Sequence, residues 1–188
     1  MFVSFLVGNT GPFKDITGIT TVCESLKKEF LERNTFKIGN YNYNKISYIY
    51  GANGSGKTNF LSALTKMQKI IVMSTVLGSN NNKLLEVPAI KKELSSPIET
   101  FKFDVDFKSK ETFFEIQILL DEILYSYSFA IQDGKIQREL LTKKKKRTEI
   151  LIKRISPKYE DIILKSGLAS FKNMVSVVRD DALCLAMA

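Results

Sequence analysis

The sequence predicts an α/β fold in which a phosphate-binding loop joins a strand to a helix, with an antiparallel β-meander after it. Three observations support this prediction: a glycine-rich motif at residues 51–58, apolar segments on both sides of it, and period-two alternation beyond residue 100. The chain of 188 residues is long enough for one domain with a sizeable core. We expect a single domain over 1–188.

Residues 51–58 read Gly-Ala-Asn-Gly-Ser-Gly-Lys-Thr, a complete G-x-x-x-x-G-K-[ST] phosphate-binding loop, or P-loop. The preceding segment Ile46–Tyr50 is short, β-branched and aromatic, which predicts a buried strand. From Asn59 to about Val76 the apolar residues recur at helical spacing, which predicts a helix. A strand, a glycine loop and a helix in this order are the context that the motif requires.

The residue types of the loop explain its chemistry. Gly51, Gly54 and Gly56 let the backbone approach a ligand closely, so that successive N–H groups form an anion nest at a helix N-terminus. Lys57 would reach the β- and γ-phosphates as the catalytic lysine, and the Thr58 hydroxyl would bind Mg²⁺. The predicted nucleotide contacts are Gly51, Ala52, Asn53, Gly54, Ser55, Gly56, Lys57, Thr58 and Asn59.

The loop with Asn59 resembles that of the ABC-type ATPase heads, the group that includes SMC and RecF proteins. The resemblance extends to the N-terminus, where Phe2–Gly8 reads as a strand and Ile16–Val22 as its returning partner. Between them, Asn9–Asp15 resembles the turn that opens such heads. Within the group, the chain is most similar to bacterial AAA-family ATPases of the abortive-infection and OLD-like type.

This resemblance implies ATP as the nucleotide and Lys14 as a further nucleotide contact. It also implies a head in which two protomers sandwich ATP, each facing the signature loop of the other. No signature loop or Walker B motif is found in this chain, so we expect a second copy, a partner chain or a further segment to supply them. The predicted fold class is therefore a P-loop NTPase core of ABC-head type that is incomplete at its C-terminal end. The chain would then be a fragment or a natural short product.

Tyrosines before the loop offer a second possible nucleotide contact. Ser25–Arg33 predicts a short helix capped by Ser25, and Asn40–Asn44 predicts a polar turn. Tyr41 and Tyr43 in that turn either stack on an adenine or pack in the loop.

Alternating apolar residues after the P-loop helix predict the meander. We expect a linker over 78–99 with a flexible loop at 78–83 and partial helix at 84–94. The β-subdomain spans 100–165, and a helical region starts within 166–188 with Asp180 or Asp181 as its N-cap. The predicted strands cover 101–107, 114–120, 123–131, 136–141 and 148–154, and Asp133-Gly134 marks a hairpin.

Asp121 and Glu122 follow the apolar run 118–120 and so resemble a Walker B motif. A Walker B strand should lie parallel to the P-loop strand and lead into a crossover. Here the residues after Glu122 alternate at once, which favours a tight antiparallel turn instead. We therefore expect ATP·Mg²⁺ binding with little turnover by this chain alone.

Composition limits the other functions. The formal net charge is +8, with a basic cluster at Lys143, Lys144, Lys145, Lys146 and Arg147 that either contacts nucleic acid or forms a solvated hairpin tip. No run is long enough to span a membrane and no signal peptide is recognised, so we expect no membrane contact and a cytoplasmic protein. The two cysteines, Cys23 and Cys184, are expected to be reduced thiols, and the lack of histidine excludes histidine-based zinc sites and triads.

Three functions follow from these features. The leading one is the N-terminal part of an ABC/AAA-type ATPase that hydrolyses ATP when complete and switches an effector, with phage defence implied by the resemblance alone. The second is a nucleotide-binding regulatory subunit that never hydrolyses. The third is a P-loop kinase or simple NTPase that uses Asp121 and Glu122. A pure nucleic-acid-binding role is a further alternative.

Overall fold

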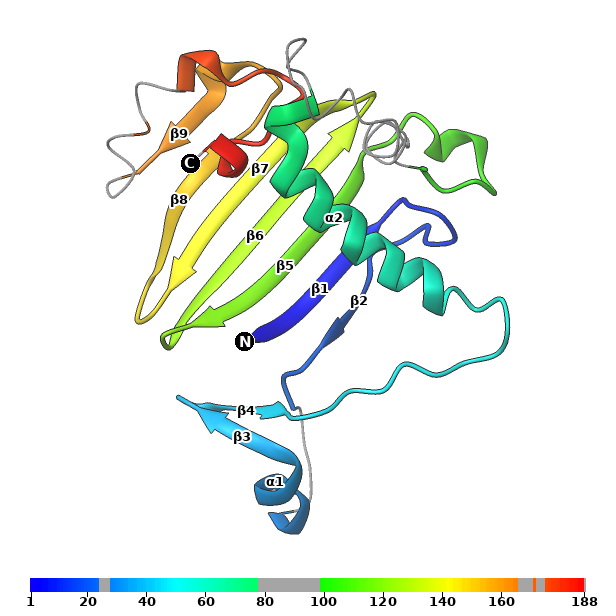
Figure 1. The fold of residues 1–188 in the computed structure, drawn as a ribbon, viewed down its shortest axis with the longest axis vertical. Coiled ribbons are helices and arrows are strands. Elements are labelled where there is room, and N and C mark those ends of the chain that lie inside the picture. The colour runs from blue at the N-terminus through cyan, green and yellow to red at the C-terminus, as the bar shows by residue number, and fades with distance from the viewer. Residues whose placement is uncertain (24–27, 78–98, 166–170, 172–174, 188) are drawn as a thin grey trace.

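The computed structural model describes residues 1–23, 28–77, 99–165, 171 and 175–187. The first strands and the meander form one seven-stranded sheet. Every pair of neighbouring strands is antiparallel, in the order β2-β1-β5-β6-β7-β8-β9 (Figure 1). The strands are β1 (Phe2–Gly8), β2 (Thr17–Thr20), β5 (Thr112–Leu120), β6 (Ile123–Gln132), β7 (Lys135–Lys144), β8 (Thr148–Arg154) and β9 (Ile162–Leu164).

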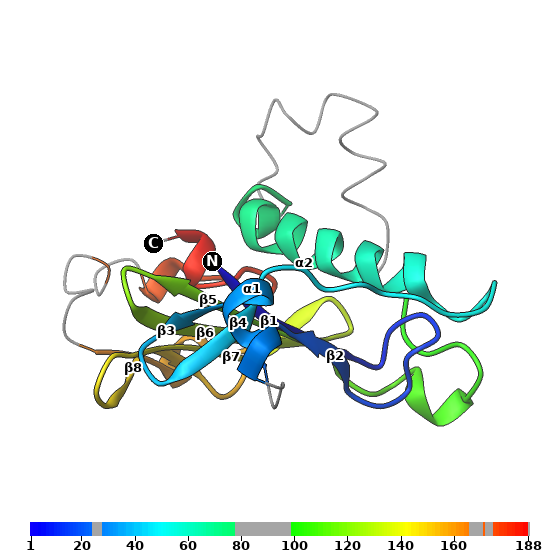
Figure 2. The ribbon, with the colours of Figure 1, turned by 90° about the horizontal axis from the view of Figure 1, so that it is seen from below.

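A separate hairpin and two helices complete the described fold. Strands β3 (Thr35–Ile38) and β4 (Tyr41–Asn44) pair with each other and follow helix α1 (Lys28–Asn34). Helix α2 (Lys57–Leu77) lies along one face of the large sheet (Figure 2). Short 3₁₀ turns are η2 (Val105–Phe107), η3 (Tyr159–Asp161) and η5 (Leu185–Met187).

The main core lies between α2 and the sheet. Cross-strand pairs place Phe5 and Phe114 on the same face of neighbouring strands as Phe129, and all three are fully buried. Met67 of α2 packs into the same cluster. Phe60, in the first turn of α2, meets the ring of Phe5 edge-on at 5.3 Å between centroids. This contact fixes the start of α2, and with it the P-loop, over β1.

A buried polar latch holds the C-terminal segment against the sheet. The carboxylate of Glu139 accepts hydrogen bonds from the Tyr127 hydroxyl (2.8 Å) and from the backbone N–H groups of Cys184 (2.8 Å) and Leu185 (3.0 Å). Arg154 lies opposite Glu139 across β7 and β8, and both side chains are fully buried. The Arg154 guanidinium donates to the backbone carbonyls of Ser156, Pro157, Arg179 and Ala182.

The meander and the opening strands confirm most of the predicted strands. β1, β5, β6 and β8 match the predicted strands closely, β2 is shorter, and β7 is longer than predicted. The Asp133-Gly134 turn has positive φ at both residues, as a type I′ hairpin turn requires. The predicted helix after the P-loop is confirmed as α2, and the predicted helix over 25–33 is observed as α1, with Ser25 itself outside the described residues.

The predicted P-loop strand is wrong. Ile46–Tyr50 forms no strand, and its apolar side chains are exposed, with Tyr50 92% exposed. A buried strand needs neighbours on both edges, and the described sheet places none beside this segment. Among the described strands no parallel pair occurs.

Three further predictions also require correction. The predicted strand 101–107 is a loop with the turn η2, because the side chain of Asn9 holds it through bonds to the backbone at both ends. Of the predicted polar turn at Asn40–Asn44, Asn40 lies in a two-residue turn with Gly39, whereas Tyr41–Asn44 form strand β4. The predicted helix from Asp180 is an irregular segment that ends in η5, held by the latch on Glu139. The loop 78–83 and the partial helix 84–94 lie outside the described residues.

Candidate functional site

The P-loop folds closely around the head of its own lysine. Lys57 is the first residue of α2, and its Nζ donates to the carbonyl oxygens of Gly51 (2.7 Å) and Ala52 (2.8 Å). Gly54 (φ +82°) and Gly56 (φ +93°) have a backbone conformation that side chains with a Cβ rarely adopt. The loop therefore has the curvature that the motif predicts.

The lining of the loop fits a chain of phosphates. Residues 53–59 surround a cavity of about 260 Å³, and none of them is acidic. The free N–H groups at the start of the 21-residue helix α2 add a partial positive charge, and Lys57 supplies a full one. Thr58 lines the same cavity, and its hydroxyl would bind a divalent cation together with phosphate oxygens and water.

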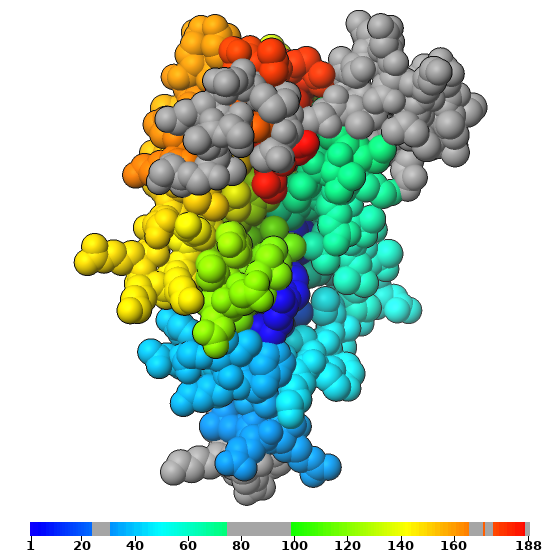
Figure 3. Space-filling view, turned by 60° about the vertical axis from the view of Figure 1, so that its left-hand side comes forward, coloured from blue at the N-terminus to red at the C-terminus, as the bar shows by residue number. Residues whose placement is uncertain are grey.

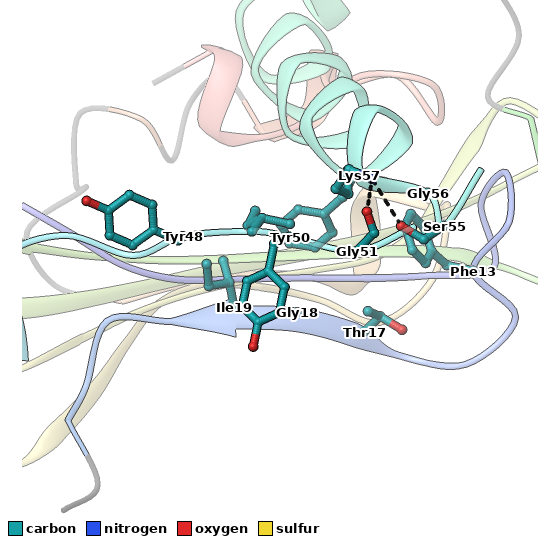
Figure 4. Close-up of a pocket in the computed structure, with 12 residues that line it drawn as sticks. Phe13, Thr17, Gly18, Ile19, Tyr48, Tyr50, Gly51, Ser55, Gly56 and Lys57 are labelled. Carbon is teal, nitrogen blue, oxygen red and sulfur yellow. Dashed lines mark hydrogen bonds between the residues drawn. The ribbon is translucent and has the colours of Figure 1, made fainter. Parts of the chain in front are cut away.

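A larger aromatic cavity adjoins the loop, with a volume of about 410 Å³ (Figure 4). It shares the lining residues Ser55, Gly56 and Lys57 with the smaller cavity, so both spaces border the P-loop. Its other walls come from β2, from the turn before it and from the segment before the loop, and include Phe13, Thr17, Ile19, Tyr48 and Tyr50. A nucleoside and its phosphates could occupy the two spaces together.

Residues 46–173 match a family model described as "AAA domain, putative AbiEii toxin, Type IV TA system". The chain belongs to this AAA-domain family. The match spans more than half of the chain and includes the P-loop, α2 and the meander, so this is a nucleotide-binding domain of an AAA-type P-loop ATPase family. Members of such families bind ATP, usually with Mg²⁺. No curated protein and no solved structure matches the chain.

The structure places the tyrosines of this AAA domain differently from the sequence prediction. Tyr41 and Tyr43 line neither cavity of the P-loop, and Tyr43 is buried, so of the two alternatives the structure favours packing in the loop over adenine stacking. Tyr48 and Tyr50 lie there instead (Figure 4). Sequence reasoning missed them because it assigned their segment to a buried strand.

Lys14 is engaged elsewhere in the described AAA domain. Its Nζ bonds the Asp104 carboxylate at 3.0 Å and lies 4.8 Å from the centre of the Phe107 ring. The hydrogen bond from Lys14 lowers the pKa of the Asp104 carboxyl. The predicted contact of Lys14 with the nucleotide stays a prediction, although the adjacent Phe13 does line the aromatic cavity.

Asp121 and Glu122 form the turn between β5 and β6. Both have positive φ (49° and 61°), and Leu120 pairs with Ile123 across the turn, which confirms the hairpin and excludes a Walker B strand here. Neither residue lines the P-loop cavities. In the described part of the chain, no group of three or more His, Cys, Asp or Glu side chains could hold a metal ion.

Two remaining predictions concern the cysteines and the membrane. Cys23 and Cys184 are both free thiols, as expected. Burial raises the pKa of the Cys184 thiol well above its ordinary value, and the neighbouring Glu139 adds to the shift. None of the helices in the described ranges has the length and apolar character needed to cross a bilayer.

Proposed function

We propose that this AAA domain binds ATP·Mg²⁺ with its phosphates in the P-loop and its base in the aromatic cavity. The observation that carries the proposal is that Ser55, Gly56 and Lys57 line both cavities. An anion nest alone would accept any polyphosphate, whereas an adjoining aromatic wall adds a surface for a planar base.

A binding measurement with two ligands tests both parts of this site. Isothermal titration should give micromolar binding of MgATP and weaker binding of magnesium tripolyphosphate, which lacks the base. Lys57→Ala should weaken both by about 10- to 150-fold, because a hydrogen bond to a charged group contributes about 1.5–3 kcal/mol. Lys66→Ala, on the same helix but outside both cavities, is the matched control.

Substitution in the aromatic wall separates the base from the phosphates. Tyr50→Ala should weaken MgATP binding and leave tripolyphosphate binding unchanged. Equal affinity of the wild type for the two ligands would refute the base site while leaving the phosphate site in place. If Lys57→Ala binds MgATP and tripolyphosphate with the wild-type affinities, the phosphate site is refuted.

We further propose that the domain is part of an ABC-type head of the SMC, RecF and OLD kind, completed by another segment or chain. The support is the exposed apolar segment Ile46–Tyr50, which directly precedes the P-loop and has no strand beside it in the described sheet. In open α/β sheets, ligands bind at the carboxyl ends of parallel strands, where a neighbouring strand can present an acid to the nucleotide. A second copy or a partner would supply that strand together with the signature loop.

Under this proposal, ATP hydrolysis belongs to the completed head. Phosphoryl transfer needs a positioned water and charge stabilisation in addition to the P-loop. The isolated chain should therefore turn over ATP negligibly in a phosphate-release assay. Robust turnover would show that the catalytic acid lies within these residues. A regulatory subunit that never hydrolyses is the second candidate, supported by the lack of acidic residues lining either cavity.

The effector is proposed from the family description, which names a toxin of the abortive-infection type. We propose that the nucleotide state of this domain switches such an effector during phage infection. Phage plating on cells that carry the complete system, with and without Lys57→Ala, tests this. Equal protection by both would refute a nucleotide-controlled switch.

A further inference from the structure

We propose that single-stranded nucleic acid binds a second groove, on the side of the domain away from the P-loop. This basic groove lies between the β3–β4 hairpin and the tips of the β5–β6 and β7–β8 hairpins, and has a volume of about 500 Å³. Residues that line it include Tyr41, Gln117, Glu122, Leu124, Lys144 and Lys145. None of its lining residues belongs to either P-loop cavity.

Strand register brings the basic cluster to this groove. Leu124 pairs with Lys144 across β6 and β7, so an apolar floor and a cationic wall lie side by side. Figure 3 shows the yellow β7–β8 tip projecting beside the yellow-green β5–β6 tip, above the blue β3–β4 region. The opposite wall, the β3–β4 hairpin, is held by Tyr43, which stacks on Phe36 and packs with Val3.

Most cations of the cluster are available for an anionic ligand. Lys143 is paired with Glu149 at 3.2 Å. For Lys144 through Arg147, which are all exposed, the described residues provide no ion pair. Glu122 is the acidic side chain that lines the groove, against two lysines. If the hairpin tip were only a solvated surface, its lysines would line no cavity. Here Lys144 and Lys145 form one wall of the groove.

An exposed aromatic ring favours nucleic acid over other polyanions. Tyr41 is 56% exposed in the same groove as Lys144 and Lys145, although about a hundred residues separate them in the sequence. Proteins that bind single strands combine a basic groove with aromatic rings on which bases stack. Asn40 and Gln117 also line the groove. The Gln117 Nε2 donates to the Glu115 carboxylate at 3.1 Å, so its amide oxygen and the Asn40 amide are the groups that can pair with base edges.

The dimensions favour single strands over duplexes. Cavities of about 300–1,000 Å³ hold drug-sized ligands, so the groove has room for a nucleotide unit. In a duplex the bases stack on each other and offer Tyr41 no free face. DNA and RNA share the chemistry that this groove recognises, and the experiment distinguishes them.

Fluorescence anisotropy with labelled oligonucleotides tests the proposal. Single-stranded oligo-dT and oligo-rU of about 12 nucleotides should bind, and a duplex of the same length should bind more weakly. If four cations contact phosphates, the logarithm of the affinity falls against that of the salt concentration with a slope of about −2.8. This corresponds to about fiftyfold between roughly 50 and 200 mM salt. The ratio of the affinities for oligo-dT and oligo-rU shows whether the groove prefers DNA or RNA.

Variants separate stacking from charge. Tyr41→Ala should weaken binding by about five- to 150-fold and Tyr41→Phe should restore it, because the ring and not the hydroxyl stacks. The double variant K144Q/K145Q should reduce the salt slope to about −1.4. Tyr159→Ala and the double variant K108Q/K158Q alter exposed residues outside the groove and should change neither quantity.

Several outcomes would overturn the proposal. Unchanged binding in Tyr41→Ala, tighter binding of duplex, or equal competition by poly-glutamate would each show that the tip attracts polyanions by charge alone. Binding that Lys57→Ala abolishes would place the oligonucleotide in the P-loop. Absence of binding at low salt would refute the site outright, whatever the result for ATP.

Discussion

Replacing Glu139 by Gln tests whether the buried latch stabilises the domain. The carboxylate is fully buried and accepts three hydrogen bonds, from the Tyr127 hydroxyl and from the N–H groups of Cys184 and Leu185. Leu183, beside these residues, donates its N–H to the Ser74 hydroxyl of α2 at 3.1 Å. The latch therefore connects the sheet to the far end of the helix that begins at the P-loop.

The magnitude follows from the number of donors. An amide keeps one acceptor oxygen and turns an NH₂ group toward a backbone N–H, so at least one of the three bonds is lost and a donor is left without an acceptor. A hydrogen bond to a charged group contributes about 1.5–3 kcal/mol, and the two bonds that remain are weakened by the loss of charge. We expect Glu139→Gln to lower the free energy of unfolding by about 3 kcal/mol, a large part of the stability of a typical domain. For a chain of this size the melting temperature should fall by about 6–12 °C.

Urea denaturation and thermal melting measure this loss, with Glu149→Gln as the matched control. Glu149 is an exposed partner of Lys143, so its substitution should change stability by less than about 0.5 kcal/mol. MgATP affinity at low temperature should stay the same in Glu139→Gln, since Ser74, where the C-terminal segment meets α2, lies about 25 Å along the helix from Lys57. If Glu139→Gln unfolds at the same urea concentration as the wild type, the free energy cost of burying the carboxylate equals the stabilisation from its hydrogen bonds. The latch then does not stabilise the fold.

Two further predictions concern pH and the P-loop backbone. The buried Cys184 thiol keeps its proton in the folded state, whereas in the unfolded chain the same thiol loses its proton above about pH 8.5. The free energy of unfolding therefore falls by up to about 1.4 kcal/mol for each pH unit above that value. In urea titrations between about pH 8 and 10.5, Cys184→Ala should show a shallower decline than the wild type, and parallel declines would contradict the burial argument. Gly56→Ala forces a Cβ into a residue with φ +93° and to within 3.3 Å of Pro12, at a cost of about 1–3 kcal/mol, and should weaken MgATP binding at least tenfold. Gly39→Ala, with φ +60° and open space around it, should destabilise the chain without changing that affinity; an equal loss of affinity in both variants would sink the argument.

The meander could be predicted because its signals are local. Period-two alternation and the Asp133-Gly134 pair each depend on neighbouring residues, and the structure confirms both in β6 and β7. The β3–β4 hairpin has a comparable local signal, although the sequence prediction placed a polar turn there. Gly39-Asn40 is a two-residue hairpin loop with positive φ at the glycine alone, as in a type II′ turn. The many polar residues in β3 and β4 make the alternation of apolar and polar side chains hard to recognise.

The segment 101–107 shows where a local signal is overridden. Phe101, Phe103 and Phe107 alternate with polar residues as in a strand, but the rings of Phe103 and Phe107 each have their centroid within 6 Å of that of Phe101. The cause lies about 100 positions away, where Asn9, itself in a left-handed conformation, bonds the backbone at Phe101 and Phe107. No pattern within the segment records that partner. Sequence reasoning therefore assigned a strand to a loop.

The P-loop shows how far a motif determines a site. Residues 51–58 contain everything needed to curve the backbone and hold Lys57, and these features depend on contacts within the loop itself. The strand predicted before it depends instead on neighbours, and in the described sheet Ile46–Tyr50 has none. The same residues that would be buried by such neighbours, Tyr48 and Tyr50, form one wall of the aromatic cavity. Addition of a parallel strand at this segment would therefore change the shape of the base site while leaving the phosphate site intact. If another segment or chain completes the head, as we propose, its addition should alter the selectivity for the base more than the affinity for tripolyphosphate. A titration of both ligands against the isolated and the completed domain would measure this.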